Sequence, residues 1–447
     1  MSKRLLIVTQ HFWPENFRIN DLVDGFLADD IVVDILCGMP NYPHGEWFDG
    51  YTASSPMLED YHGANLYRCR EIRRKGNTSL RIFLNYISFP LTAACSLRKL
   101  PGDYDAVLCY NTSPVLMSFP AILAARSFKA PLTNYVLDIW PENLYSVLNI
   151  QNKALRRIAS AVSDWHYRRA DRLITVSESL SQRLRARVGN TNAKGCQEPE
   201  KRYAVIPQYC EDFYDCKAVP RNECAATVSD TVPTTKNATE TQYQDNAQSA
   251  AIADMPEDTV RPFLIQFAGN FSPAQSLNTV LDAIAMVKAA QGTNAPAIHL
   301  QLIGDGMSLA ALQTQAKQLH LDDCVQFYGS VTAVEIPALA AKADALLISL
   351  SDSADVGLTI PAKFASCMAA GKPLLVSING EGARVASESK GALVSAASDT
   401  KALAENMLAL AAMPLAARTA MGEASHAYYK THFNRSTLLQ AIETFIF

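Results

Sequence analysis

The sequence predicts an α/β protein built from two doubly wound domains. Short apolar runs alternate with helical patterns along the 447-residue chain, and such alternation is typical of parallel sheets covered by helices on both faces. About half of the residues are apolar, and the chain is too long for one ordinary hydrophobic core. A polar stretch divides the alternation into two series, so we expect two Rossmann-like domains.

The predicted elements follow in order from the N-terminus. In the first half, apolar runs predict strands at residues 5–9, 32–37, 106–110, 132–137 and 173–176, with helices at 115–128 and 153–169. In the second half they predict strands at 263–267, 299–303, 325–328, 345–350 and 374–378, separated by helices of about three or four turns. Parallel sheets bind ligands beyond the carboxyl ends of their strands, so these ends are where site residues are expected.

The boundary between the two domains is expected near residue 205. Residues 1–204 form the first predicted domain, and residues 205–425 form the second. Within the second, residues 215–260 contain few aromatic residues and long polar runs, so they cannot bury enough apolar surface to offset the entropy of ordering them. We interpret this stretch as a disordered surface insertion, with a docking arm as the alternative. Residues 426–447 carry enough apolar side chains to require packing against a domain.

Composition argues against several classes of function. The formal net charge of -4 gives no reason to expect nucleic acid as the main partner. The ten cysteines are scattered without a Cys-x-x-Cys pair, which argues against a zinc site and favours a reducing compartment. The N-terminus has only a short apolar run, typical of a first strand, and no apolar stretch approaches the roughly 20 residues that span a bilayer. We therefore expect a cytoplasmic protein.

Residues 359–378 form the most informative stretch of the chain. Pro361 suits a first helical turn, Gly371 and Pro373 end the helix, and an apolar strand follows. The start of such a helix collects backbone N–H groups and a partial positive charge, and Lys363 adds a mobile cation. The stretch therefore predicts a phosphate site. The alternative is one more helix and strand of an ordinary α/β sheet.

Seven blocks of sequence, taken in order, resemble one enzyme family. They are QHFWPENFRIND (10–21), MPNYP (39–43), DIWPEN (138–143), AGNF (268–271), LIGDG (302–306), TIPAK (359–363) and GEGA (380–383). No block is specific alone, but the ordered set is similar to family 4 glycosyltransferases. Within that family it most resembles the WbuB-like L-fucosamine transferases of O-antigen, capsule and colanic acid synthesis. The resemblance covers nearly the whole chain apart from the insertion.

The resemblance implies a GT-B fold, in which two domains face each other across a cleft and the last helix, within 426–447, crosses back to the first domain. It implies a retaining transferase that moves a sugar, such as the N-acetylated deoxyhexose L-FucNAc, from UDP to a polyprenyl-diphosphate-linked glycan. Such an enzyme would lie peripherally at the inner face of the plasma membrane. No cofactor or metal is expected, because GT-B enzymes neutralise the diphosphate with side chains and helix ends, and no His/Asp cluster has ligand spacing.

The expected donor site departs from the family's usual pattern. Family members hold the diphosphate with an Arg and a Lys five positions apart, which here are Asn270 and Gln275, and a family glutamate falls on Ser366. Asn and Gln donate hydrogen bonds but carry no charge, so Lys363 becomes the main cation for the diphosphate. Turns at later strand ends complete the predicted donor site with Gly304, Glu381 and Gly382. A helix-start glutamate with no ligand is the alternative for Glu381.

Strand ends of the first domain predict the acceptor side. Arg18 is a candidate partner for a phosphate or for the charge that develops on the leaving group. Asp138 and Glu142 are candidates for binding an acceptor hydroxyl or removing its proton, with a structural turn as the alternative. Further acceptor-side candidates are Glu15, Asn16, Asn41 and Ser113, although Asn16 also suits a helix cap. No double-displacement nucleophile is predicted, because the leaving diphosphate can itself accept the proton.

A basic, aromatic-rich part of the first domain predicts peripheral membrane contact. An apolar helical pattern at 80–89 lies among basic residues that suit an anionic surface, namely Arg68, Arg70, Arg73, Arg74, Lys75, Arg81, Arg98 and Lys99. An amphipathic core helix with solvated charges at its ends is the alternative. Two rival functions also stay open. One is a UDP-N-acetylglucosamine 2-epimerase on the same fold, and the other is a non-catalytic subunit that binds nucleotide sugars.

Overall fold

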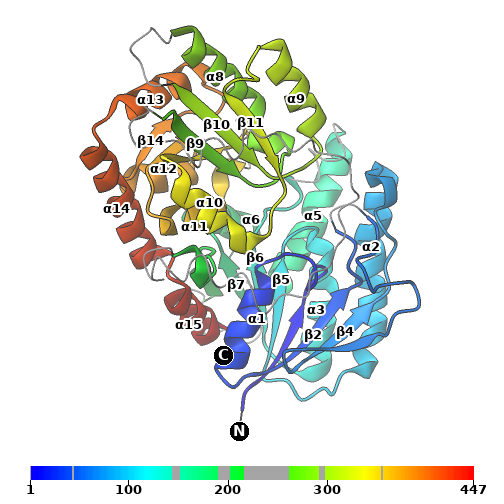
Figure 1. The fold of residues 1–447 in the computed structure, drawn as a ribbon. Coiled ribbons are helices and arrows are strands. Elements are labelled where there is room, and N and C mark those ends of the chain that lie inside the picture. The colour runs from blue at the N-terminus through cyan, green and yellow to red at the C-terminus, as the bar shows by residue number, and fades with distance from the viewer. Residues whose placement is uncertain are drawn as a thin grey trace. The chain divides into compact units, whose positions relative to one another are not determined.

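The computed structural model describes residues 2–42, 45–142, 152–189, 202–215, 261–290, 297–353 and 356–447 (Figure 1). The chain divides into two compact units, of which unit 1 comprises Met1–Pro207 and Ser436–Phe447 and unit 2 comprises Gln208–Arg435. The C-terminal part of unit 1 begins later than the expected residue 426, because α14 (Leu415–His432) packs against α11 (Lys363–Ala369) of unit 2. The predicted insertion, apart from Asp215, lies outside the described residues.

Unit 1 is built around an eight-stranded sheet of order β3-β4-β2-β1-β5-β6-β7-β8. Its strands are β1 (Arg4–Val8), β2 (Val32–Gly38), β3 (Leu58–Tyr61), β4 (Ala64–Cys69), β5 (Ala106–Asn111), β6 (Leu132–Val136), β7 (Arg172–Thr175) and β8 (Tyr203–Val205). All neighbours pair in parallel except the antiparallel β3 and β4. The direction of strand addition reverses between β1 and β5, and such a switch point is where parallel sheets bind ligands.

The helices of unit 1 are α1 (Ile19–Ala28), α2 (Ser79–Ser96), α3 (Ser118–Phe128), α5 (Lys153–Arg169), α6 (Glu178–Val188) and α15 (Arg435–Ile446). Side-chain caps begin three of them. Thr78 Oγ1 accepts from Arg81 N at α2 (3.4 Å), Asn152 Oδ1 accepts from Ala154 N at α5 (2.8 Å), and Ser177 Oγ accepts from Leu180 N at α6 (3.2 Å). At α15, Arg172 on β7 donates to the carbonyl of Phe445 (2.8 Å). The prediction that the last helix returns to the first domain is therefore confirmed.

Unit 2 contains a six-stranded, all-parallel sheet of order β11-β10-β9-β12-β13-β14. Its strands are β9 (Phe263–Ala268), β10 (Ile298–Ile303), β11 (Val325–Gly329), β12 (Ala345–Ser349), β13 (Leu374–Ser377) and β14 (Ala392–Ser395). Besides α11 and α14, its helices are α8 (Leu277–Ala290), α9 (Leu309–Gln318), α10 (Ile336–Lys342), α12 (Glu381–Glu388) and α13 (Thr400–Ala412). The strand order reverses between β9 and β12, which makes that pair the switch point of unit 2.

Each strand predicted from an apolar run coincides with a strand of the structure, and both sheets are doubly wound, so the predicted fold class is confirmed. The predicted helix at 115–128 begins as a 3-10 turn, η3 (Val115–Met117), before α3. The strands that the sequence did not reveal are β3, β4, β8 and β14. The hairpin of β3 and β4 carries charged and amide side chains, such as Glu59, Asn65 and Arg68, so it lacks an apolar run.

Helix α2 overturns the expectation about apolar stretches. Leu80–Lys99 is a 20-residue helical stretch that is long and apolar enough, by length and composition only, to cross a membrane. Its inner side packs against β2, β4 and α3, and a helix packed in the core of a domain passes the same test. Two of the basic residues assigned to the surface around it are also buried, Arg68 and Arg74. Their side chains belong to the interior of unit 1.

Candidate functional site

The loops at the switch point of unit 2 lie unusually close together. Gly304, which follows β10, has φ +134°, and a Cβ there would lie 1.9 Å from the carbonyl oxygen of Gly269 after β9. A Cβ at Gly306 would lie 2.3 Å from Asn270 Oδ1. Glycine is therefore required at both positions, because any other side chain would push the loops apart. The result is a backbone-lined edge of the sheet, where Gly304 N donates to the Gly329 carbonyl (2.8 Å) and Gly306 N donates to Asp305 Oδ1 (2.7 Å).

Lys363 brings a cation to this edge. It begins α11, and its Nζ donates to Gln275 Oε1 (2.5 Å) and lies 4.0 Å from the ring centroid of Phe267. A Cβ on Gly269 would lie 3.1 Å from the same Nζ, so the ammonium group points at the glycine loop. Among the described residues no carboxylate pairs with Lys363. The structure thus brings together Lys363, Gln275 and Gly269, with Asn270 and Gly304 on the adjoining loops.

The environment of Lys363 favours an anionic ligand. Burial lowers the pKa of the Lys363 ammonium to about 8, because the charged form loses hydration without gaining a carboxylate. An amide oxygen and an aromatic face compensate only part of that loss. A diphosphate placed against Nζ would supply the missing negative charge and restore a higher pKa for the lysine.

Three predicted donor residues lie on helices of the same unit without a described contact to Lys363 Nζ. Ser366 Oγ donates to the Lys363 carbonyl one turn back along α11 (3.1 Å). Glu381 begins α12 and forms an ion pair with Arg384 (2.8 Å), so its carboxylate is already engaged. A Cβ on Gly382 would lie 2.6 Å from Ile378 Cδ1, so glycine at this position allows the start of α12 to pack closely against Ile378. Their ligand roles stay predictions.

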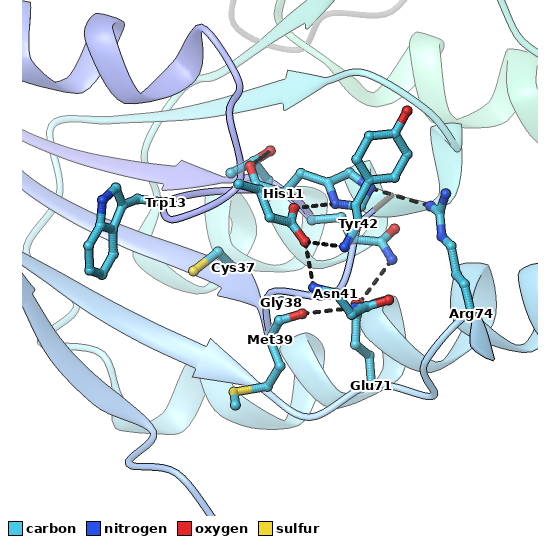
Figure 2. Close-up of polar contacts among 12 residues, drawn as sticks. His11, Trp13, Cys37, Gly38, Met39, Asn41, Tyr42, Glu71 and Arg74 are labelled. Carbon is cyan, nitrogen blue, oxygen red and sulfur yellow. Dashed lines mark hydrogen bonds and ion pairs between the residues drawn. The ribbon is translucent and has the colours of Figure 1, made fainter. Parts of the chain in front are cut away.

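Unit 1 carries a buried polar network beyond the ends of β1, β2 and β4 (Figure 2). Glu15 Oε1 accepts from the backbone N–H groups of Asn41 (2.7 Å) and Tyr42 (2.8 Å). Glu15 Oε2 lies 2.7 Å from His11 Nδ1, and Arg74 Nη2 lies 3.3 Å from His11 Nε2. Because an arginine can only donate, His11 accepts at Nε2 and donates from Nδ1 to Glu15. Glu15 therefore fixes the backbone turn at 41–42 and the orientation of the His11 ring.

Glu71 closes the other end of this network. Gln10 Nε2 donates to Glu71 Oε2 (2.9 Å), and Asn41 Nδ2 donates to Glu71 Oε1. Burial and the nearby Glu15 carboxylate raise the pKa of Glu71 to about 8. Glu71 is therefore largely protonated at neutral pH, and Asn41 links it to the Glu15 side of the network.

We expect Glu15→Gln and Glu71→Gln to differ sharply in stability at pH 7. Glu15→Gln should lower the free energy of unfolding by about 2 kcal/mol, because the amide weakens three hydrogen bonds to a carboxylate. Glu71→Gln should leave it unchanged or raise it, because the neutral amide cannot ionise and so removes the deprotonation that favours the unfolded wild type at this pH. Gln10 Oε1 and Asn41 Oδ1 have no hydrogen-bond partner among the described residues. Either side-chain amide can therefore rotate so that its oxygen accepts from the amide group that Glu71→Gln introduces. Chemical denaturation measures both variants.

The same pair gives a pH test. Native Glu71 keeps its proton to about pH 8, whereas the unfolded side chain releases it near 4.5, so the native state binds more protons between these values. The free energy of unfolding of the wild type should therefore fall as pH rises through that window. Glu71→Gln should remove this part of the slope. An unchanged slope in Glu71→Gln would contradict the assigned protonation state.

Arg74 occupies the centre of this edge. Its Nε donates to Asn85 Oδ1 (2.9 Å), and its guanidinium carbon lies 5.3 Å and 5.1 Å from the ring centroids of Tyr42 and Tyr86. Arg68 is held equally firmly by Glu59 (3.0 Å). Both side chains hold loops of unit 1 together, which corrects their assignment to a membrane-facing surface.

Asp138 lies on a rigid turn after β6. Three hydrogen bonds at Trp140 hold the turn. Trp140 N donates to the Tyr167 hydroxyl (3.1 Å), Trp140 Nε1 donates to Ser113 Oγ (2.8 Å), and the Trp140 carbonyl accepts from Arg187 (2.8 Å). Asp138 itself has no hydrogen-bond or ion-pair partner among the described residues. Burial raises the pKa of its carboxyl to about 6. A partly buried carboxylate that lacks a cation is suited to accept a proton near neutral pH.

Asp138 and the polar network meet at one edge of the sheet. Burial raises the pKa of Tyr42, and Tyr86, Glu15 and Asp138 add smaller electrostatic contributions in the same direction. The Tyr86 and Trp140 rings are in edge contact, with centroids 6.0 Å apart. The ends of β1, β2, β4, β5 and β6 thus bring the Asp138 carboxylate, a buried arginine and several aromatic rings to the switch point of unit 1.

Two family models match the chain. Residues 16–196 match the model described as a glycosyl transferase 4-like domain, and residues 262–413 match the model described as glycosyl transferases group 1. The first range lies within unit 1 and the second within unit 2. The chain therefore contains a glycosyl transferase 4-like domain and a glycosyl transferases group 1 domain.

Solved glycosyltransferase structures share this fold across 99% of the chain. Alr3699/HepE from Anabaena, solved with UDP and glucose, is 15% identical, with 98% of its own chain covered and a TM-score of 0.66. Sucrose-phosphate synthase from Thermosynechococcus elongatus is 13% identical, with 98% covered and a TM-score of 0.69. WaaG, a glycosyltransferase involved in lipopolysaccharide biosynthesis, is 14% identical, with 99% covered and a TM-score of 0.62. No curated protein matches the chain. At these identities the likeness shows the GT-B fold.

The structure also places the remaining acceptor-side candidates, Glu142, Arg18 and Asn16, within unit 1. Glu142 pairs with Arg187 (3.2 Å) and lies 3.7 Å from Arg183, so α6 holds its carboxylate. Arg18 directly precedes α1, and its charge interacts with Tyr135 on β6. Asn16 is exposed and does not cap α1. The roles of these residues in binding the acceptor stay predictions.

Sequence reasoning missed His11, Glu71 and Arg74, which lie in the candidate site of unit 1. His11 lies within the block at 10–21, four residues before Glu15, and that spacing was the available signal. Glu71 and Arg74 follow β4, which was not recognised as a strand, so they were not seen to lie at a strand end. A hairpin prediction for 58–69 would have placed both residues at the correct edge.

Proposed function

We propose that this protein is a retaining glycosyltransferase that uses a UDP-sugar donor. The observation that carries the proposal is the buried ammonium group of Lys363, which pairs with no carboxylate among the described residues and lies beside glycine loops at the switch point of unit 2. Such a site lacks one negative charge, and a nucleoside diphosphate supplies it. The match of this region to a group 1 glycosyltransferase model supports the same function, as does the presence of UDP in the structure of Alr3699/HepE.

In the proposed donor site, Lys363 and the amide of Gln275 bind the diphosphate, and Asn270 and the Gly304 turn contact the nucleotide. Neutral Asn270 and Gln275 stand where the family has charged residues, so Lys363 would carry most of the charge compensation. We propose no metal. Within the described residues, no group of three or more His, Cys, Asp or Glu side chains could hold one.

Transfer would break the bond between the anomeric carbon and the diphosphate oxygen and form a bond to an acceptor hydroxyl on the same face of the sugar. UDP leaves with the electron pair of the broken bond. The hydroxyl proton passes either to Asp138 or to an oxygen of the leaving diphosphate. The raised pKa of Asp138 supports the first route, because a carboxylate near pH 6 accepts a proton more readily than an ordinary aspartate.

The proposed acceptor is a polyprenyl-diphosphate-linked glycan, and the proposed sugar is an N-acetylated deoxyhexose such as L-FucNAc. The product would enter O-antigen, capsule or colanic-acid-type polysaccharide. The ordered sequence blocks support this choice, and the fold is shared with WaaG, a glycosyltransferase involved in lipopolysaccharide biosynthesis. We propose that the enzyme acts in the cytoplasm, peripherally at the inner face of the plasma membrane.

Thermal shift with UDP, GDP, UDP-GlcNAc, UDP-L-FucNAc and GDP-fucose tests the donor site. A ligand that binds the native state raises the melting temperature by mass action. At a ligand concentration a hundred times its Kd, the free energy of unfolding rises by about 2.7 kcal/mol. We expect a shift with UDP and a larger one with a single UDP sugar, followed by transfer to a lipid-linked acceptor. No shift with any nucleotide would contradict the proposal. Conversion of the free nucleotide sugar without acceptor would favour the epimerase.

A further inference from the structure

Helix α5 exposes a continuous apolar stripe. Leu155, Ile158, Val162 and Trp165 are 53%, 61%, 40% and 36% exposed, although each is a large apolar side chain. Their spacing of three, four and three residues places them on one face of the helix. The opposite face packs inward through Ser163 and Tyr167. Isolated exposed apolar residues are ordinary, but four in a row along one helix mark an interaction surface.

The charges around the stripe are almost all positive. Lys153, Arg157, Arg168 and Arg169 are exposed on the same helix, and the Arg169 guanidinium carbon lies 4.9 Å from the Trp165 ring centroid. The only carboxylate of α5 is Asp164, which forms an ion pair with Arg187 of α6 (2.8 Å). The outer face of α5 is therefore apolar along its centre, cationic at its ends and without an uncompensated negative charge.

Helix α2 repeats this pattern. Leu80, Phe83 and Leu91 are 67%, 44% and 57% exposed, and the stretch Leu80–Lys99 contains no carboxylate. Arg81, Arg98 and Lys99 are exposed along it. Both α2 and α5 pack against α3 and η3, so the two helices belong to one layer of unit 1 (Figure 1).

We infer that the outer faces of α5 and α2 form a docking surface for an anionic lipid bilayer. A bilayer interface takes up apolar side chains and aromatic rings while its phosphate headgroups pair with flanking lysine and arginine. The excess of positive charge on both helices selects this occupant over a second copy of the chain, whose identical basic face would repel it. The inference deepens the proposed function, because it assigns the membrane contact to α5 as well as α2. It rests on the proposed function only for the identity of the acceptor.

Vesicle binding of the full-length chain tests the inference. The probes are vesicles of phosphatidylcholine alone and of phosphatidylcholine mixed with phosphatidylglycerol, and the variants are Ile158→Ser with Val162→Ser, and Arg157→Glu. Leu415→Ser, which removes a 69% exposed leucine from α14 of unit 2, is the matched control. We expect the wild type to bind mixed vesicles in a salt-sensitive manner, each α5 variant to bind at least about tenfold more weakly, and the control to bind normally.

The inference is overturned if the α5 variants bind mixed vesicles like the wild type, or if the wild type binds neither vesicle. It is also overturned if the wild type is a dimer that Ile158→Ser with Val162→Ser makes monomeric, because the stripe would then be an interface between copies. The UDP-induced thermal shift, measured on every variant, reports the folded donor site. Vesicle binding without a UDP shift would reject the proposed function alone, and a UDP shift without vesicle binding would reject this inference alone.

Discussion

Asp138→Asn should lower the turnover number at least about 100-fold while the protein stays folded and binds UDP. A positioned general base typically contributes between about 100-fold and 10,000-fold, and asparagine keeps the shape of the side chain while removing its capacity to accept a proton. The turn that holds Asp138 depends on Trp140, Tyr167 and Arg187, none of which contacts the carboxylate, so the substitution leaves this turn intact. Steady-state transfer kinetics with saturating donor measure the effect.

The pH profile of transfer separates a base from a residue that only binds. The pKa of Asp138 is about 6, so its carboxylate is ionised above that pH and protonated below it. The turnover number of the wild type should therefore rise with pH and level off above about 6, and Asp138→Asn should lose this limb. If Asp138→Asn is slow but its turnover number still rises with pH up to about 6, the base would be the leaving diphosphate and not Asp138.

Stability gives an independent reading of the same residue. Native Asp138 has a pKa of about 6 against 3.8 in the unfolded chain, so the native state binds more protons between these values and loses stability as pH rises through them. At pH 7 the buried carboxylate is a net cost, and Asp138→Asn should raise the free energy of unfolding by about 1 kcal/mol. Glu142→Gln is the control. It removes an ion pair with Arg187, so it should lower stability and affect turnover far less.

The sequence was sufficient to predict the fold because parallel strands buried on both faces leave an apolar signal. Runs such as 5–9 and 374–378 coincide with β1 and β13, which are buried along most of their length. The hairpin of β3 and β4 lies at the edge of its sheet and exposes alternate side chains, so the same signal is absent. Periodicity therefore fails where a strand is only partly covered.

Individual site residues were harder to predict because charge alone does not reveal burial. Arg74 lies in a basic run with Arg73, which is partly exposed and pairs with Glu46, yet Arg74 turns inward between Tyr42 and Tyr86. Asp138 and Glu142 share one sequence block, but only Glu142 lies within reach of Arg187. These distinctions depend on partners from distant parts of the chain, which the spacing of residues does not specify.

Lys363→Met should separate donor binding from folding. Methionine matches the length of the lysine stem but carries no charge, so we expect UDP to bind at least about tenfold more weakly, which is about 1.4 kcal/mol, and turnover to fall by a similar factor. The free energy of unfolding at pH 7 should stay the same or rise by about 1 kcal/mol, because no carboxylate of the described chain depends on the buried ammonium group. Calorimetric titration with UDP and chemical denaturation measure the two quantities.

The titration of Lys363 predicts opposite pH trends for stability and for donor binding. Its pKa is about 8 in the native state against 10.5 when unfolded, so the unfolded chain binds more protons between these values and the free energy of unfolding rises with pH there. Over the same range the free enzyme loses the proton that the diphosphate requires, so the affinity for UDP should fall by up to about tenfold per pH unit.

Both trends should vanish in Lys363→Met, because they have one cause. Lys372→Met is the matched control: its Nζ donates to the carbonyls of Ala341 and Ala343 (2.7 Å each) and not to the glycine loop. It should cost some stability and leave the pH dependence of UDP binding unchanged. If UDP binding to the wild type were independent of pH between 7 and 10, Lys363 would not be the cation that holds the diphosphate, and the donor site would have to lie elsewhere in unit 2.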